Sequence, residues 1–449
     1  MPAFFSDNMV LQQQTKVKFW GKSLPNKKII LIGSWSNHAV QCTSNANGDW
    51  NIIVSTPKAG GPYEVSISDG KPLKFSNVLI GEVWFCAGQS NMEMPMRGFK
   101  NQPVLNSNEI LADANNVNLR LFETKKNAAK TPQNNVTGKW DVSSSESASQ
   151  FSAVAYMYGS MLQKKLNIPV GIIVSSVGGT RIQSWMDYQT LMEMPDSSTF
   201  LKDYNKIDTA KDKHKCATAL YNAMIAPFVG YGIKGFLWYQ GESNRHEPKV
   251  YARLFPVMVA NWRKAWNQKD TLPFYYVQIA PFDSKDSTKS VKGLREAQLN
   301  ALKQIPKSAM AVTMDIGDET HIHPSHKKEV SERLLYCALV NTYGYKGISF
   351  SGPLYKSMSV TNNKINISFD YAELGLTTFG NELINFEIAG ADKVFYKANA
   401  KIEDNQTITV WNDNVINPIA VRYAYKEYAK GELYNNQGLP ASSFRTDNW

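Results

Sequence analysis

The sequence predicts an α/β protein with a mainly parallel sheet, flanked by small N- and C-terminal β domains. Two observations lead to this prediction. Almost continuously apolar runs between residues 79 and 317 alternate with helical patterns, as in βαβ units with right-handed crossovers. Both ends of the chain instead carry short strand-like runs separated by turn-forming residues. We therefore expect domains at residues 1–78, 79–345 and 346–449.

The N-terminal region is predicted to form a small β sandwich or barrel. Its strand-like runs are rich in β-branched and aromatic residues, and they read KVKFWG, KIILIGSW, DWNIIVST and YEVSIS. Clusters such as KAGGP and SDGKP separate these runs and predict turns.

The central region contains the alternating pattern. Its predicted strands read VLIGEVWFCAG, PVGIIVSSV, IKGFLWYQ, PFYYVQIA and AMAVTMDIG. Helical patterns lie at residues 151–166, 216–228, 249–266, 293–305 and 325–341. Beyond residue 346 the pattern returns to strands, which read KINISFDY, NFEIAG, KVFYKA, TITVW and AVRYAY. The tail GLPASSFRTDNW is expected to pack against a neighbouring element, because it carries a Phe and a Trp.

Composition excludes several classes of protein. The 449 residues are 43% apolar and 20% charged, which is typical of a globular chain and too apolar for a disordered one. No run approaches the ~18 apolar residues that a membrane span requires, and no repeat indicates a solenoid or propeller. The net charge of +10 is spread along the chain, whereas a nucleic-acid binder usually concentrates its charge on one face. The four cysteines show no CxxC spacing, so a structural zinc cluster is not expected.

Polar turns follow four of the apolar strands. They are residues 88–91 (GQSN), 178–180 (GGT), 240–244 (QGESN) and 315–324 (DIGDETHIHP). Ligands of open α/β sheets collect beyond the carboxyl ends of the strands. One such turn is common by chance, but four in one domain indicate a functional site.

Ser90 and His323 are the candidate nucleophile and base. Serine is a weak nucleophile and needs an adjacent base, and imidazole titrates near neutrality. An N-cap role is the structural alternative for Ser90. Metal binding is the alternative for the histidines at positions 321, 323 and 326, with carboxylates from Asp315, Asp318 and Glu319.

Ester hydrolysis also needs hydrogen-bond donors for the oxyanion. The backbone N–H groups of Ser90 and Gly179 are suited to this role. The side-chain amide of Gln240 or of Asn244 could add a further donor, and the sequence does not choose between them.

Taken together, GQSN, GGT, YQGESN and the late IHP motif resemble the SGNH (GDSL-like) hydrolases, and most closely the bacterial sialate O-acetylesterase family and related carbohydrate acetylesterases. The resemblance extends over nearly the whole chain, from FSDNMVLQQ and GEVWFCAGQSNMEMPM to VRYAY and GLPASSFRTD. It implies a three-layer α/β/α, flavodoxin-like catalytic domain and a serine esterase that removes O-acetyl groups from sugars, with no metal and no cofactor. Ser90 matches the nucleophile of that family, His323 its base and Gly179 its oxyanion-hole glycine.

One departure from the wider superfamily concerns the acid that orients His323. Many relatives carry Asp three residues before the histidine, where this chain has Thr320. Glu242 is the first choice for that acid, and Asp318 and Glu319 are the second. A Ser–His dyad with a backbone carbonyl behind the imidazole is the third.

Three further residues are expected at the substrate, and they are Gln89, Arg181 and Trp185. A guanidinium can pair with a sialate carboxylate and an indole can stack on a sugar, although Trp185 could equally be a core residue. The expected partner is an O-acetylated sugar, most simply an O-acetylated sialic acid, with acetylated xylan, xyloglucan or another hemicellulose as the alternative. A non-catalytic glycan binder that uses Trp20, Trp35, Trp50 and Trp411 is the competing class.

Localisation is inferred from the resemblance. The sequence has no basic segment followed by an apolar one at its start. Similar proteins are commonly exported, so a secreted or periplasmic enzyme whose signal has been removed is expected, with a cytoplasmic one as the alternative. Neither an oligomeric state nor a disulfide pairing follows from the sequence.

Overall fold

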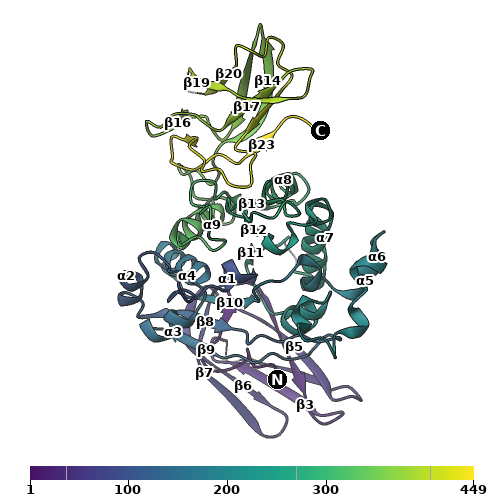
Figure 1. The fold of residues 1–449 in the computed structure, drawn as a ribbon. Helices are drawn as coiled ribbons and strands as arrows, with labels where there is room; N and C mark the ends of the chain where they lie inside the picture. The colour runs from purple at the N-terminus through teal and green to yellow at the C-terminus, as the bar shows by residue number, and fades with distance from the viewer. Residues whose placement is uncertain (37, 269–270, 405) are drawn as a thin grey trace. The chain divides into compact units, whose positions relative to one another are not determined.

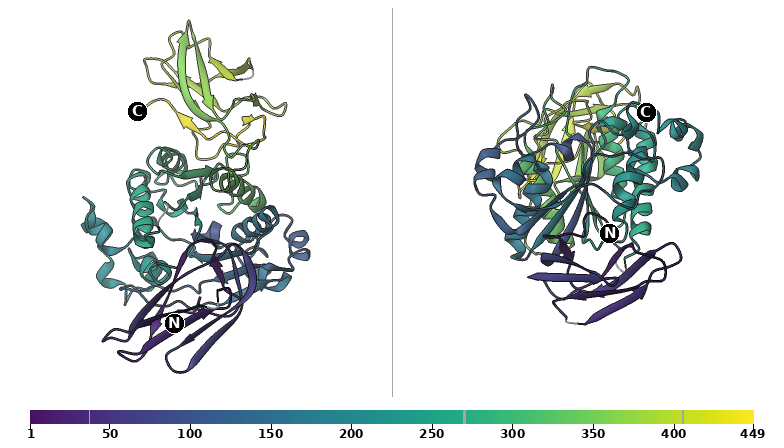
Figure 2. Two further views of the ribbon diagram at one scale, coloured as in Figure 1. Left: turned by 180° about the vertical axis from the view of Figure 1, so that it is seen from behind. Right: turned by 90° about the horizontal axis from the view of Figure 1, so that it is seen from below.

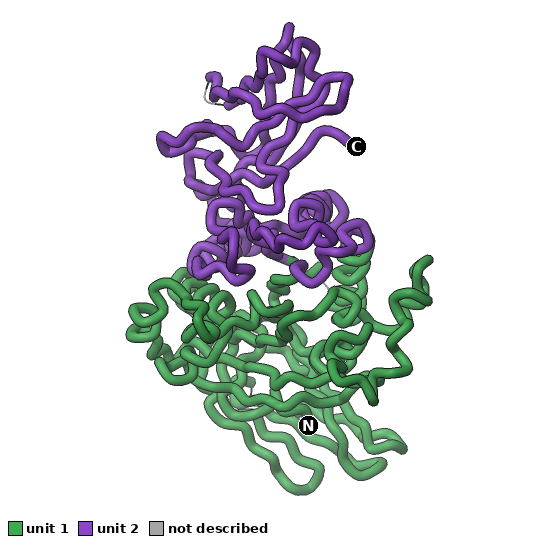
Figure 3. Tube along the Cα trace, viewed as in Figure 1, with its two compact units in different colours: residues 1–240, 254–274 green, residues 241–253, 275–449 purple. Residues whose placement is uncertain are grey.

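The computed structural model of the chain describes residues 1–36, 38–268, 271–404 and 406–449. Two compact units make up the chain (Figure 3). The first contains residues 1–240 and 254–274, and the second contains residues 241–253 and 275–449. The three domain limits expected from the sequence stay a prediction.

A mostly parallel sheet forms the centre of the first unit (Figure 1). Its strand order is β11–β7–β10–β8–β9, in which only β9 runs antiparallel to its neighbour. The bounds are β7 (Pro72–Gly88), β8 (Asn116–Glu123), β9 (Trp140–Ser143), β10 (Val170–Ser176) and β11 (Gly235–Tyr239). Every residue of β10 and β11 is buried, which confirms the expectation from their apolar sequences.

Helices cover this sheet. They are α1 (Ser90–Glu93), α2 (Ser107–Ala112), α3 (Ser145–Gln150), α4 (Ala153–Leu166), α5 (Tyr188–Met192), α6 (Ser197–Phe200) and most of α7 (Pro248–Trp266). Ser152 caps α4 by accepting a hydrogen bond from the amide of Ala155. A Cβ atom at Gly159 would lie 2.6 Å from Ile172, so the glycine lets α4 approach β10 closely. Within the described ranges, no helix is long and apolar enough to cross a membrane.

The helix predicted at about residues 216–228 is confirmed in part. The chain is helical from residue 219 to residue 228, but it forms a π-helical turn at Tyr221–Ile225 and a 3-10 turn at Ala226–Phe228. The helix begins later than predicted because Thr218 has a φ of 68°, outside the right-handed helical region. Pro227 has no backbone N–H to donate, so a regular α-helix does not continue through it.

The N-terminal strands continue into the central sheet of the first unit. They are β1 (Val10–Gln12), β2 (Lys16–Lys22), β3 (Lys28–Gly33), β4 (Ala39–Thr43), β5 (Asp49–Ser55) and β6 (Gly60–Ser68), drawn in purple in Figure 2. The first half of β7 pairs antiparallel with β6, and its second half pairs parallel with β10 and β11. One 17-residue strand therefore belongs to both regions, and the limit expected at residues 78/79 falls inside it.

The second unit contains the remaining helices and strands. Its helices are α8 (Val291–Ala301) and α9 (Lys327–Asn341), and β13 (Ser308–Ala311) also belongs to it, whereas β12 (Phe274–Val277) begins at the boundary between the units. The C-terminal strands form three sheets, with the orders β14–β15–β20–β19, β18–β17–β21–β23 and β16–β22. Their bounds are β14 (Leu354–Thr361), β15 (Lys364–Asp370), β16 (Leu376–Thr377), β17 (Phe386–Ala389), β18 (Phe395–Lys397), β19 (Asn399–Glu403), β20 (Thr407–Trp411), β21 (Ala420–Tyr423), β22 (Tyr434–Asn435) and β23 (Phe444–Arg445).

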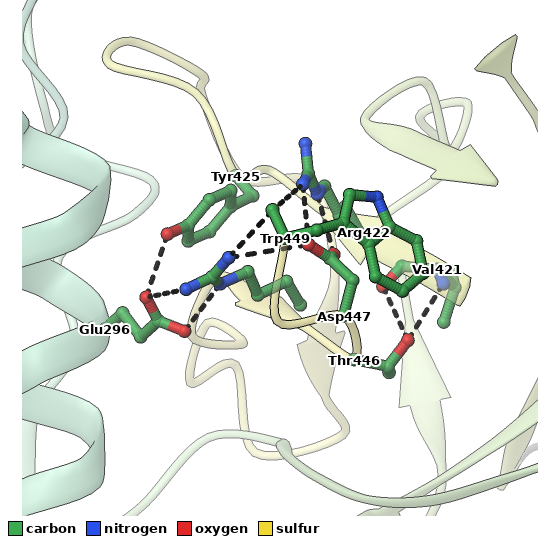
Figure 4. A network of polar contacts seen from close by, with 8 residues as sticks. Glu296, Val421, Arg422, Tyr425, Thr446, Asp447 and Trp449 are labelled. Carbon is green, nitrogen blue, oxygen red and sulfur yellow. Dashed lines mark hydrogen bonds and ion pairs between the residues drawn. The ribbon is translucent and has the colours of Figure 1, made fainter. Parts of the chain in front are cut away.

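An ionic network holds the chain terminus within the second unit (Figure 4). Glu296 of α8 accepts hydrogen bonds from Arg445 at 2.7 and 3.1 Å. The buried carboxylate of Asp447 pairs with Arg422 at 2.6 Å and with Arg445 at 3.4 Å. The network links α8 to the C-terminal tail. The tail therefore packs against a neighbouring element, as its apolar residues predicted.

Candidate active site

Three strands of the first unit end side by side. In the ladder, Gly88 at the end of β7 is paired with Ser176 of β10 on one side and with Tyr239 of β11 on the other. The turns expected to carry the chemistry begin at Gly88, two residues after Ser176, and directly after Tyr239. The backbone N–H of Gln89 donates to the Tyr239 carbonyl at 3.0 Å, which holds the first turn against β11. The sequence-based expectation that these turns share one sheet edge is therefore confirmed for the first unit.

Ser90 lies at the start of α1, and the GGT turn lies against it. A Cβ atom at Gly178 would lie 3.2 Å from the Ser90 Cβ. That separation is tight for carbon atoms, so residue 178 reaches this position because it has no side chain. Gly179 adopts a φ of +72°, a left-handed conformation that favours glycine, and a Cβ atom there would meet nothing within 4 Å.

Glu93 fixes the GGT turn, and sequence reasoning missed it. Its carboxylate accepts a hydrogen bond of 2.6 Å from the N–H of Gly178 and pairs with Lys126 at 2.6 Å. Positions 90 and 93 lie one helical turn apart, so α1 presents the serine and this carboxylate to the same loop. The spacing of Ser and Glu in GQSNME was the available signal.

Gln240 also contacts the GGT turn. Its Nε2 donates to the Thr180 carbonyl at 3.0 Å, so one N–H of this amide holds the turn in place. The hydroxyl of Thr180 in turn donates to the Val177 carbonyl at 2.8 Å. Ser90, the GGT turn and Gln240 are thus brought together within the first unit.

Arg181 and Trp185 follow the turn. The Trp185 side chain is fully buried, and its ring packs edge-on against Trp238. Its Nε1 donates to the Thr180 hydroxyl at 3.0 Å. This burial corresponds to the core alternative that the sequence left open. Arg181 is partly exposed at the head of a 3-10 turn, Ile182–Trp185.

Glu242 and Asn244 belong to the second unit, and both are buried. Asn244 donates from Nδ2 to Glu247 at 3.0 Å, and its backbone N–H donates to the Gly241 carbonyl at 2.8 Å. Arg245 donates from Nε to the backbone carbonyl of Glu242 at 2.5 Å. These bonds give the QGESN turn a fixed shape.

His323 lies just before α9, also in the second unit. Desolvation, together with the positive charge of Lys327, lowers the pKa of His323 to about 4. The imidazole is therefore neutral at pH 7 and able to accept a proton. Lys327 is itself fully buried, and desolvation lowers its pKa to about 7 against the opposing effect of the Glu242 carboxylate. Sequence reasoning missed this lysine, which follows His323 by four residues in HPSHK.

Asp318 contacts the histidine next to the expected one. It accepts hydrogen bonds from the N–H groups of Thr320 and His321 at 2.8 and 3.0 Å, and it lies 3.1 Å from the His321 ring. Desolvation raises the pKa of Asp318, but these hydrogen bonds outweigh it and lower the pKa to about 2.

The other side chains considered for a metal site each pair with a different residue. His326 lies 2.9 Å from Glu329, and Asp315 pairs with Arg333 at 2.7 Å. Among the residues that the structure describes, no three His, Cys, Asp or Glu side chains are grouped so that they could hold a metal ion.

Comparisons with known proteins extend over the whole chain. Residues 80–339 match the family model described as carbohydrate esterase, sialic acid-specific acetylesterase. The chain is 27% identical to sialate O-acetylesterase of Homo sapiens, with 98% of this chain and 91% of that protein covered. It is 26% identical to the Mus musculus enzyme of that name, over 98% and 93% of the two chains.

A solved structure is more similar. The crystal structure of a carbohydrate acetylesterase from Xanthomonas citri has a TM-score of 0.90 to this chain at 34% identity, with 100% and 99% of the two chains covered. The match of the family model over more than half of the chain shows the family. The chain therefore belongs to the carbohydrate esterase family of sialic acid-specific acetylesterases, and it is a carboxylic ester hydrolase.

Proposed function

We propose that this enzyme removes O-acetyl groups from carbohydrates through an acetyl-enzyme formed on Ser90. The observation that carries the proposal is the packing of Ser90 against the GGT turn at the common end of three strands. This arrangement puts a hydroxyl beside a glycine turn whose backbone N–H groups can stabilise an oxyanion. The proposal includes the three-layer SGNH-hydrolase arrangement of the catalytic part.

In the proposed reaction, His323 accepts the hydroxyl proton of Ser90 while Oγ attacks the acetyl carbonyl carbon. The N–H groups of Ser90 and Gly179 stabilise the resulting oxyanion. When the tetrahedral species collapses, the sugar oxygen leaves and takes the proton from His323. Water, deprotonated by the same imidazole, then releases acetate and restores the serine. A neutral imidazole before the attack agrees with the lowered pKa of His323.

Glu242 is proposed to assist His323. Its carboxylate is buried and acts electrostatically on Lys327, the residue whose charge also acts on the imidazole. Asp318 is the weaker candidate, because its hydrogen bonds go to Thr320 and His321.

The proposed substrate is an O-acetylated sialic acid, with acetylated hemicellulose as the second candidate. The family and its curated relatives support the first, and the similarity to a carbohydrate acetylesterase leaves room for the second. Acetate release from O-acetylated sialic acid, measured beside release from acetylated xylan and xyloglucan, decides between them.

Replacement of the nucleophile tests the mechanism. Ser90→Ala should lower kcat on 4-nitrophenyl acetate by at least about 10³-fold, because the covalent step needs the hydroxyl. The far-ultraviolet circular dichroism spectrum should stay unchanged. A folded variant that kept full activity would exclude the serine mechanism.

A further inference from the structure

The exposed face of the β2–β5 ribbon carries positive charge in a regular pattern. The two strands pair antiparallel, with Lys16 opposite Ser55, Lys18 opposite Ile53 and Trp20 opposite Asn51. The alternate residues of β2, Val17 and Phe19, are buried. Because side chains alternate along a strand, Lys16, Lys18, Trp20 and Lys22 all belong to the outer face.

A hollow of about 1160 Å³ lies along one half of this face. Three lysines line it, Lys16, Lys18 and Lys58, and none of the lining residues within the described ranges is an aspartate or a glutamate. Gly230 lines the opposite wall, and a Cβ atom there would lie 3.5 Å from the Cδ of Lys18. Among the described residues, none of these three lysines forms an ion pair, so their charges are available to an anionic ligand.

A second hollow of about 490 Å³ continues past Lys18, which lines both. Its walls combine indole rings with side-chain amides, namely Trp20, Trp50, Asn45, Asn51, Asn134 and Asn135. Trp20 is half-buried, and the Lys18 Nζ lies 5.6 Å from its ring centroid. Asp49, the one acid among the described residues that line this hollow, is paired with Lys22 at 3.1 Å and so does not neutralise the three lysines.

We propose that these two hollows form one binding site for an acidic glycan chain, distinct from the turns around Ser90. The ammonium groups of Lys16, Lys18 and Lys58 would face carboxylates along the chain. The exposed part of Trp20 would contact a sugar face, and the asparagine amides would bind hydroxyl groups. The assignment rests on the proposed function, because an enzyme that acts on sugars meets glycan chains. The site would hold the polymer, while the chemistry occurs elsewhere.

The experiment measures binding of the full chain to polygalacturonate, a carboxylated glycan, by isothermal titration calorimetry. Its neutral counterpart, a galactan, serves as the uncharged probe. The triple variant Lys16→Gln, Lys18→Gln, Lys58→Gln should weaken polygalacturonate binding about tenfold or more, since each exposed charge pair contributes a fraction of a kcal/mol to about 1 kcal/mol.

A matched control removes the same charge elsewhere in the N-terminal region. Lys28, Lys71 and Lys74 are exposed and line neither hollow. Their triple exchange to Gln should leave the affinity within about twofold, because distant exposed charges are screened by salt. Equal losses in the two triple variants would overturn the site, because binding would then follow net charge alone.

Two further measurements keep the proposal falsifiable. Asn51→Asp places a negative charge opposite Trp20 without removing a packed group, and it should also weaken binding. Galactan that bound as tightly as polygalacturonate would overturn the acidic ligand. Oligo(dT) that bound as tightly through the same lysines would overturn the glycan assignment.

Activity separates this inference from the proposed function. The lysine variants should hydrolyse 4-nitrophenyl acetate at the wild-type rate, because no residue of the site belongs to the turns at the strand ends. A wild-type protein inactive on all acetyl esters would refute the proposed function and leave the binding measurement to decide the glycan site.

Discussion

Glu93 shows how a single carboxylate sets the shape of the site in the first unit. It accepts a hydrogen bond from the N–H of Gly178, the residue that lies against Ser90. It lies in the same short helix as Ser90, the proposed nucleophile, so a displacement of this side chain would move the GGT turn relative to the hydroxyl. We regard Glu93 as a positioning residue.

Glu93→Ala should lower kcat on 4-nitrophenyl acetate about tenfold to a hundredfold with a smaller change in KM, because small misplacements of reacting groups are costly. Glu93→Gln keeps an acceptor oxygen and should recover most of the rate. Lys126→Met removes only the ion partner and serves as the control. A Glu93→Ala enzyme with wild-type kcat would contradict the positioning role.

Burial of His323 and, in addition, the charge of Lys327 should set the acidic limb of the pH profile. In the wild type, the pKa of His323 is lowered to about 4, so kcat/KM should hold down to about pH 5 and fall below it as the imidazole is protonated. Lys327→Met removes a positive charge, so the pKa of His323 rises and the limb shifts to higher pH.

The exposed neighbour gives the control for this change. Lys328→Met removes the same charge from the surface and should leave the profile in place. An unshifted limb in Lys327→Met would show that Lys327 does not act on His323.

For single residues, the sequence allowed candidate site residues to be chosen, but it did not predict which residues they contact. Ser90, Gly179 and Gln240 could be chosen because the turns follow apolar strands. The contact of Asp318 with His321 could not be predicted from the sequence. His321 and His323 are the same residue type two positions apart, so the sequence does not show which of them a carboxylate will contact. Glu93 was missed because its partner is a backbone N–H far along the chain.

Among the elements, β7 shows why long apolar strands were predictable. Continuous burial gives a strand an apolar sequence that no surface element shares. The segment 216–228 has the same apolar character, and its helix forms only over residues 219–228 with π and 3-10 geometry, because Thr218 has a positive φ and Pro227 lacks a backbone N–H. Hydrophobic periodicity reports burial and does not report such local constraints.

Gly88 is where two of these elements come closest. A Cβ atom there would lie 2.1 Å from the Tyr239 carbonyl oxygen. Gly88→Ala should therefore reduce the free energy of unfolding by at least about 2 kcal/mol, because backbone atoms of β11 would have to move. Urea denaturation measures this change.

The control is Gly70→Ala. Gly70 also has a positive φ, of +119°, but a Cβ atom there meets nothing within 4 Å. Both variants place an alanine at a positive φ, but only Gly88→Ala brings its Cβ atom against the backbone of β11. If both lost the same stability, the approach of β7 to β11 would not require glycine.

For the molecule as a whole, the terminal ionic network makes the tail part of the second unit. Asp447 has a fully buried side chain between Arg422 and Arg445 (Figure 4). Desolvation raises the pKa of Asp447, but hydrogen bonding and charge from Arg422 outweigh it and lower the pKa. The stabilisation is therefore present above the unfolded-state pKa, near 4, and is lost as the pH falls.

Asp447→Asn should reduce the free energy of unfolding by about 2 kcal/mol at pH 7, since a charge-assisted pair is lost. The difference from the wild type should shrink near pH 3, where the carboxylate is protonated in the unfolded chain. Asp413→Asn, at an exposed position, provides the control. A deficit independent of pH would show that the charge of Asp447 does not stabilise the fold.

The continuity of β7 has a consequence for inheritance. A segment joined by a flexible linker can be lost or exchanged by recombination without disturbing its neighbour. Here any crossover near residue 79 would sever a strand that is bonded at one end to β6 and at the other to β10 and β11. The strands β1 to β6 and the strand β7, which leads into the turn with Ser90, should accordingly be inherited together.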